Sequence, residues 1–282
     1  PAFAHADYAR LLAPLVKSDQ LVVLLPGTLG TLEFAAVFRE CGGNPEVVFA
    51  ETDTLPYATR LVGPGTVHVH GRTASVMLGV LPAKKTEWAS ERLRGLFHFQ
   101  PASNVLEVGF SSLNPVIHPP GTILNAGRIE RSRGEFYIYE EGMTPSVVHV
   151  MELLDEERRA IAVEFGLRLP PINEAIYQSG NGPKGTTWEA LNGSSSLTPI
   201  KGPTSLNTRY LSEDIPYGLM TFASIASQIG VNTPIMNSLI ELGMALLRRK
   251  PEDGSRGVDH LGIRGLSADQ ILRFVTEGAV HS

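Results

Sequence analysis

One histidine stands where an apolar stretch of sequence meets two prolines. Residues 112–120 read "SLNPVIHPP", with His118 directly before Pro119 and Pro120. Proline lacks the amide donor of a helix and restricts the residue before it. The pattern therefore predicts a helix that ends at His118 and presents the imidazole to a cavity, where it can act as a general acid or base. A core histidine bonded to a backbone carbonyl is the alternative.

A second polar segment, "NTRYLSED" at residues 207–214, precedes an apolar stretch. The planar guanidinium of Arg209 can hold a carboxylate, and Asp214 can orient an imidazole. Asp214 can equally cap a helix that begins at Ile215 and Pro216, because its carboxylate can accept amide hydrogen bonds from the first turn. The two interpretations of Asp214 are compatible with each other.

A glycine-containing turn, "PGTLG" at residues 26–30, follows an apolar run and opens a predicted helix. Open α/β sheets bind ligands at such turns, where backbone amides point away from the helix N-terminus. Two interpretations remain open. Either Pro26, Gly27, Thr28 and Gly30 contact a cofactor, or the turn only redirects the chain.

Two further sequence patterns give weaker evidence for a functional site. Residues 180–185 fit G-x-G-x-x-G, but they lie in a loop with a proline and not between a strand and a helix, so no dinucleotide site is assigned there. His68 and His70 lie two apart on one face of a predicted strand, without an acidic or thiol ligand nearby. We therefore expect no metal site.

Composition excludes two classes of partner. The chain has 282 residues, 43% of them hydrophobic, enough for a large core and two domains, and its net charge is −5. The charge offers no basic surface to nucleic acid, and no apolar run approaches the roughly 20 residues that cross a bilayer. Cys41 is the single cysteine and is expected to be buried. The lack of a disulfide framework favours a cytoplasmic location, and the start at Pro1 without a charged-then-apolar signal pattern leaves room for processing or missing upstream sequence.

The first hundred residues alternate between strand and helix patterns. Strands are predicted at 21–25, 46–51, 66–71 and 74–82, and helices at 3–16, 32–39 and 86–97. This alternation predicts a parallel sheet covered on both faces, with the first strand buried on both sides.

Long helical patterns replace the strands after about residue 101. Asn104 is the predicted N-cap of a helix that continues through Val116. Another helix is predicted from Pro145 to Phe165, with Thr144 as its N-cap and Gly166 as its stop. Further helices are predicted at 215–229, 234–247 and 268–276, with loops around one short helix at 177–203.

Three segments resemble, in order and spacing, the opine dehydrogenases of the octopine/nopaline type. They are "SSLNPVIHPPGTILNAGRIE", "FYIYEEGMTPSVVHVMELLDEERRAIAVEFG" and "LNTRYLSEDIPYGL". "LLPGTLGTLEF" is similar to a late strand and turn of the family's Rossmann domain. The resemblance implies an α/β Rossmann-like domain at residues 1–100, followed at 101–282 by an all-α domain of the 6-phosphogluconate dehydrogenase C-terminal type.

The resemblance also implies an activity. Such enzymes use NAD or NADP to condense an α-keto acid reductively with the amino group of an amino acid. It implies that His118 is the catalytic histidine, Asp214 its partner and Arg209 the ligand of a substrate carboxylate. Asn207 and Tyr210 are expected to bind substrate, and a homodimer is expected.

One departure from the family pattern concerns the start of the chain. The family's first strand, glycine fingerprint and ribose-binding residue have no counterpart here, so we expect the Rossmann domain to be N-terminally incomplete in this chain. Two alternative functions stay open. They are a reductase of a simple keto acid, and a non-catalytic dinucleotide-binding or assembly protein.

Overall fold

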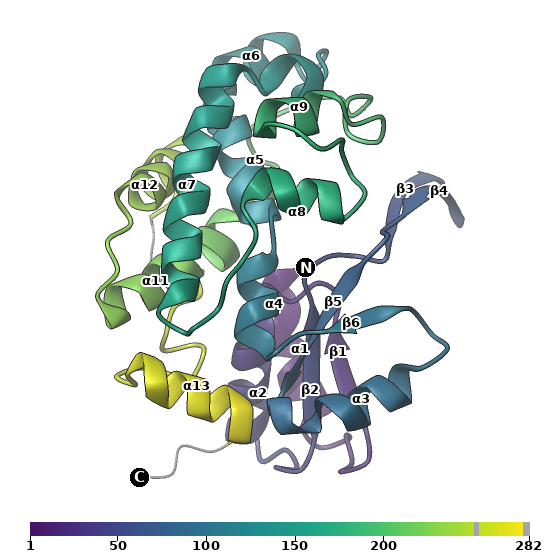
Figure 1. Ribbon diagram of the computed structural model, residues 1–282, viewed down its shortest axis with the longest axis vertical. Helices are drawn as coiled ribbons and strands as arrows, with labels where there is room; N and C mark the ends of the chain where they lie inside the picture. The colour runs from purple at the N-terminus through teal and green to yellow at the C-terminus, as the bar shows by residue number, and fades with distance from the viewer. Residues whose placement is uncertain (251–253, 279–282) are drawn as a thin grey trace.

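The computed structural model describes residues 1–250 and 254–278, and its α/β half forms the lower part of Figure 1. The main sheet has the strand order β1-β2-β5-β6. The elements of this half are η1 (Ala2–Ala4), α1 (His5–Leu12), β1 (Leu21–Leu24), α2 (Gly30–Glu40), β2 (Val48–Thr52), β3 (Tyr57–Gly63), β4 (Thr66–Arg72), β5 (Val76–Leu81), η2 (Ala83–Lys85), α3 (Thr86–Leu93) and β6 (Phe99–Pro101).

The main sheet is mixed, which corrects the prediction of a parallel sheet. β1 and β2 are parallel, whereas β2 and β5 are antiparallel, with Phe49 opposite Leu81. The connection from β2 to β5 contains the β3–β4 hairpin in place of a helix, so the chain makes no helical crossover of the kind that parallel strands require. β1 was expected to be buried on both sides, but its four residues are only half-buried because it lies at an edge of the described sheet.

The β3–β4 hairpin extends away from the main sheet (Figure 1). The run at 66–71, expected in the main sheet, forms β4 and pairs only with β3. Leu61 and Val67 are cross-strand partners, and both are exposed. The side chain of His70 lies outside the described residues, so the His68–His70 pattern has no structural outcome.

Helices make up the second half, drawn in teal to yellow in Figure 1. The predicted helices at 145–165, 215–229, 234–247 and 268–276 are confirmed, with small shifts at their ends. Thr144 precedes the first of them, but its side chain makes no capping hydrogen bond. The elements are α4 (Val105–Ser111), α5 (Asn114–Ile123), α6 (Ala126–Ser132), η3 (Ile138–Gly142), α7 (Pro145–Val163), α8 (Ile172–Gln178), α9 (Thr187–Asn192), α10 (Arg209–Ser212), η4 (Ile215–Leu219), α11 (Met220–Ile229), α12 (Pro234–Leu247) and α13 (Ala268–Glu277).

Two predictions about the helix near His118 are wrong. The helix that Asn104 caps does not continue through Val116, because extended backbone at Ser112 separates α4 from α5. The prolines do not end the helix at His118 either, since α5 runs through Pro119 and Pro120 to Ile123. Nearly all of α5 is buried among its neighbours, so packing holds these prolines in the helix although they cannot donate amide hydrogen bonds.

A shared hydrophobic core joins the two halves. Phe34 and Phe38 of α2 belong to the same buried cluster as Phe110 of α4 and Ile271 of α13. The last helix, α13, returns to the α/β half beside α2 (Figure 1). Cys41, expected to be buried, is exposed at the end of α2. No helix among the described residues has the length and hydropathy needed to span a membrane.

Candidate active site

His118 and Asp214 form a close pair although 96 positions separate them. The Nδ1 atom of His118 lies 2.7 Å from Oδ2 of Asp214. Their side chains are 11% and 9% exposed, so the pair is shielded from bulk water without being sealed. The predicted hydrogen-bond contact between these residues is confirmed.

The structure shows which groups His118 and Asp214 contact. The imidazole of His118 contacts a carboxylate instead of a backbone carbonyl. Asp214 precedes η4 and makes no side-chain capping bond there, because its carboxylate is turned toward the imidazole. The ring of Tyr210 stacks on that of His118, with centroids 4.0 Å apart and planes 24° apart. Asp214 and Tyr210 thus fix the orientation of the ring from two sides.

His118 lines a cavity of about 650 Å³ between the two halves. One wall comes from the α/β half and includes Asp53, Thr54 and Met77. The facing wall comes from α4, α5, α7 and α8, together with Tyr139 of η3 and residues of the neighbouring loops. Since Nδ1 is bonded to Asp214, Nε2 is the nitrogen of His118 that remains for a molecule in this cavity.

Two charged residues of the cavity were not predicted. Arg158 is 1% exposed, and its guanidinium donates to Asp155 and to the carbonyl of Phe110. Burial raises the pKa of Asp53 to about 6, although its carboxylate accepts the amide of Met77 at 2.9 Å. Neither residue has a distinctive sequence signal, because Arg158 lies in a charged helical pattern and Asp53 in a polar turn.

Arg209 and Asn207 lie outside this cavity. Arg209 begins α10 with its side chain 60% exposed, and its Nε is 4.0 Å from Oε2 of Glu213. Asn207 is exposed in the preceding loop. Of the three predicted substrate ligands, Tyr210 places its side chain against the histidine–aspartate pair, whereas Arg209 contacts Asp214 through its backbone carbonyl, which accepts the amide of Asp214 at 3.2 Å.

The turn at residues 26–30 has its amides occupied from within the protein. Glu51, fully buried, accepts the amide of Leu29 with Oε1 and that of Thr31 with Oε2, both at 2.8 Å. A Cβ at Gly27 would lie 2.3 Å from Glu51, so glycine is needed there. The amides of Leu29 and Thr31 are therefore occupied within the protein, whereas cofactor contact by Pro26, Gly27, Thr28 and Gly30 stays a prediction. Thr28 remains half-buried, with its hydroxyl 3.3 Å from that of Ser112.

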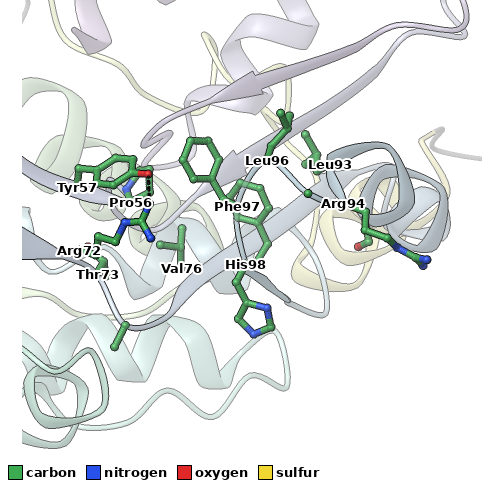
Figure 2. A pocket seen from close by; sticks show the side chains of 14 residues that line it. Pro56, Tyr57, Arg72, Thr73, Val76, Leu93, Arg94, Leu96, Phe97 and His98 are labelled. Carbon is green, nitrogen blue, oxygen red and sulfur yellow. Dashed lines mark hydrogen bonds between the residues drawn. The ribbon is translucent and has the colours of Figure 1, made fainter.

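A second cavity, of about 550 Å³, lies behind the β5–β6 wall (Figure 2). Val76 and Phe99 line it, whereas the next residues along their strands, Met77 and Gln100, line the cavity of His118. Successive side chains of a strand point to opposite faces, so the two strands separate the two cavities. No predicted site residue lines the second one.

Comparison with known proteins identifies the family. The model of the NAD/NADP octopine/nopaline dehydrogenase alpha-helical domain matches residues 101–247. Over 277 residues the chain is 36% identical to an opine dehydrogenase from Arthrobacter sp. (strain 1C), covering 98% of this chain and 77% of the relative. The chain belongs to the octopine/nopaline dehydrogenase family. The resemblance found in its sequence is thereby confirmed.

Another relative is similar in sequence, and two solved dehydrogenase structures are similar in fold. A protein named ocs from Agrobacterium tumefaciens (strain Ach5) is 27% identical over 269 residues, covering 93% of this chain and 73% of its own. An octopine dehydrogenase solved with NADH and agmatine matches all of this chain and 77% of its own, with a TM-score of 0.76 at 21% identity. A yersinopine dehydrogenase with NADP⁺ bound covers 98% of this chain and 76% of its own, with a TM-score of 0.65 at 15% identity. The fold is thus a Rossmann-like α/β domain followed by an all-α domain.

Proposed function

We propose that this opine dehydrogenase uses His118 and Asp214 as its catalytic pair in the NAD(P)H-dependent reductive condensation of an α-keto acid with an amino acid. Family membership supports the reaction class, since the chain is an NAD(P)-dependent oxidoreductase acting on CH–NH groups. The 2.7 Å contact between His118 and Asp214 at the wall of the interdomain cavity is the observation that carries the residue assignment.

The reaction needs a group that moves protons in both directions. The amine nitrogen loses one proton as it adds to the keto carbon, and the keto oxygen gains one to become a hydroxyl. The nitrogen loses its second proton as the C=N bond forms, and the hydroxyl gains one to leave as water. Nε2 of His118 can take a proton from the nitrogen and give one to the oxygen in each of these two stages. Asp214, on Nδ1, holds the ring in the tautomer that leaves Nε2 free, and it stabilises the imidazolium between the two steps.

Reduction follows the loss of water. NAD(P)H supplies the hydride that converts the C=N bond into the secondary amine, and the nitrogen keeps or receives one proton. The protein's own task is to hold the two substrates in one orientation and to limit water in the cavity. Tyr210 supports that task, because its stacked ring keeps the imidazole in one plane.

The residues of the 26–30 turn fit a cofactor only in part. Gly27 and Gly30 donate their amides to the carbonyls of Thr52 and Gly27, and Pro26 has no amide hydrogen, so these residues provide no phosphate cradle like that of a dinucleotide fingerprint. Thr28 is the member of the turn with a half-buried polar side chain, so we propose that it contacts the cofactor or substrate.

We propose that Arg209 binds the carboxylate of a substrate and that Asn207, two residues earlier in the chain, also contacts substrate. Arg209 is one residue from Tyr210 and five from Asp214, and its ion pair with Glu213 is long, with 4.0 Å between Nε and Oε2. Its exposed side chain is therefore able to turn toward a substrate without breaking a buried bond. Arg209→Lys should raise the KM values of the substrates more than that of the cofactor; unchanged substrate KM values would remove this assignment.

A coupled assay tests the reaction itself. NADH or NADPH oxidation is followed with pyruvate alone and with pyruvate plus each member of a panel of amino acids. Opine formation predicts oxidation that depends on both substrates, together with a product in which the amino acid carries the new carboxyethyl group. Oxidation with pyruvate alone, unaffected by amino acids, would establish a simple keto-acid reductase instead.

We further assign the cofactor domain to residues 1–100 and the substrate domain to residues 101–282, in a cytoplasmic homodimer. The exposed free thiol of Cys41 suits a reducing compartment. The exposed Leu61 and Val67 of the hairpin suit a subunit contact, because isolated two-stranded hairpins bury little apolar surface. Light scattering on the wild type and on Leu61→Glu tests the dimer, and a monomeric wild type would refute it.

A further inference from the structure

Arg256 is the centre of a buried charge cluster that we define as Arg256, Glu33 and Glu51. It lies in the loop between α12 and α13, and it is 1% exposed. Burial lowers the pKa of Arg256, while the nearby carboxylates of Glu33 and Glu51 oppose that effect. Nη1 of Arg256 is 3.5 Å from Oε2 of Glu33. A charge this deep is retained only with partners around it.

Several of these partners belong to the segment that begins directly after Asp214. The amide of Arg256 donates to the carbonyl of Pro216 at 3.0 Å. Its side chain donates from Nε to the hydroxyl of Thr221 at 3.2 Å and from Nη2 to the carbonyl of Tyr217. Arg256 is thereby fixed to η4 and the start of α11.

The guanidinium of Arg256 also contacts the α/β half. Nη2 of Arg256 also donates to the carbonyl of Thr28. Thr28 and Leu29 have φ angles of +52° and +66°, in the left-handed region that non-glycine residues rarely adopt. Such a turn persists only when its surroundings hold it, and here Arg256 holds it from one side and Glu51 from the other.

The same turn contacts the segment that leads to His118. The hydroxyl of Thr28 lies 3.3 Å from that of Ser112, which is 1% exposed in the bend between α4 and α5. Arg256 therefore connects to both members of the catalytic pair. One connection runs through Thr28 and Ser112 to α5 and His118, and the other through η4 to Asp214.

We propose that Arg256 is a positioning residue for the reaction, because it sets the spacing between the turn at residues 26–30 and the segment carrying Asp214. The inference rests on the proposed function of the His118–Asp214 pair. Arg256 does not line the cavity of His118 and acts only through the residues that it holds. Small displacements of catalytic groups slow a reaction strongly, because a shift of about 1 Å lowers the rate roughly 10²-fold.

The alternative is an arginine that stabilises the fold and nothing more. Two variants separate these roles. Arg256→Lys keeps a charge near Glu33 but cannot donate to Thr28, Tyr217 and Thr221 together. Arg256→Met removes the charge. Arg39 provides the matched control, since its guanidinium also joins the two halves, 5.7 Å above the ring of Phe274, but has no contact with the 26–30 turn.

Steady-state kinetics well below the melting temperature give the first readout. We expect Arg256→Lys to lower kcat at least tenfold, with substrate and cofactor KM values within about threefold of wild type. Arg39→Met should keep wild-type kcat even where its melting temperature falls. Arg256 variants that melt earlier but turn over normally per folded molecule would overturn the proposal, as would a loss confined to KM.

Amide hydrogen exchange gives a second readout that does not depend on turnover. Arg256→Lys should speed exchange in residues 112–118 and 213–219, while α6 at 126–132 stays at its wild-type rate. Unchanged exchange in the first two segments would overturn the proposal, even if wild-type protein showed no opine dehydrogenase activity. A failed wild-type assay would count only against the proposed function, so the two failures are distinguishable.

Discussion

Two groups of charged residues lie in this protein, and they differ in what surrounds them. His118 and Asp214 each have a few partners and remain about one-tenth exposed beside a cavity. Arg256 and Glu51 are almost completely buried; both carboxylate oxygens of Glu51 accept backbone amides, and Nε and Nη2 of Arg256 donate to protein atoms while its Nη1 lies 3.5 Å from Glu33. The first pair keeps one nitrogen, Nε2 of His118, for a substrate.

The difference shows how proton-transfer groups are recognised in a fold. A group that exchanges protons with a substrate needs an open side, and its partner fixes only the opposite side. A charge whose partners surround it completely serves the geometry of the backbone. Burial and charge alone do not separate the two cases, but the presence of a cavity does. The comparison predicts that the first pair governs rate and the second group stability and spacing.

The largest expected effect is the loss of turnover in His118→Ala. Without the ring, the proton transfers lose their carrier, and kcat should fall roughly 10²- to 10⁴-fold. The melting temperature should change little, because water from the cavity can solvate the carboxylate of Asp214. The check is kcat with pyruvate and an amino acid, beside thermal melting with and without NAD(P)H. Near-normal turnover with a depressed melting temperature would reassign His118 as a structural residue.

The second effect is on stability, in Glu51→Gln. Glutamine can accept one of the two amides of Leu29 and Thr31, but its own amide then faces the other donor, which is left unsatisfied. The free energy of unfolding should fall by about 1–3 kcal/mol. Denaturant unfolding measures it, with the exposed Glu46→Gln as the control. Equal stabilities for the two variants would mean that the buried carboxylate is not needed to hold the turn.

Local patterns in the sequence predicted most of the elements. The helix starting at Pro145 has a proline where one is tolerated and a glycine, with φ of +70°, just after its end. Such signals depend only on residues close together in the sequence, so they can be recognised without knowing which elements pack against the helix. Strand direction is different, because the pairing of β5 with β2 depends on what the connection contains. The prolines of α5 show the same limit, since burial outweighs their local preference.

The site was predictable where a family pattern spans distant segments. His118 and Asp214 lie 96 positions apart, and spacing alone does not join them. Arg256 was not predicted because it lies in a polar, glycine-containing segment of the kind expected in an exposed loop. Several of its partners are also backbone carbonyls, which have no sequence signature. Whether the amides of the 26–30 turn can bind a ligand depends on Glu51. Glu51 lies in a predicted apolar strand, so the sequence did not indicate that its carboxylate accepts amides of the turn.

The smallest expected effect concerns Asp53, which faces the same cavity as His118 but from the α/β wall. Burial raises the pKa of Asp53 from its ordinary 3.8 to about 6, so folding favours the protonated form. Its contribution to stability is present below pH 4 and is lost as the pH rises through 6.

Asp53→Asn stays neutral, so its melting temperature should equal that of wild type near pH 4 and exceed it above pH 6. We expect a gain of about 1 kcal/mol, because cavity water reduces the cost of the charge. Melting curves from pH 4 to 8 measure the difference, with the exposed Asp19→Asn as the control; a difference independent of pH would show that Asp53 is ionised without cost.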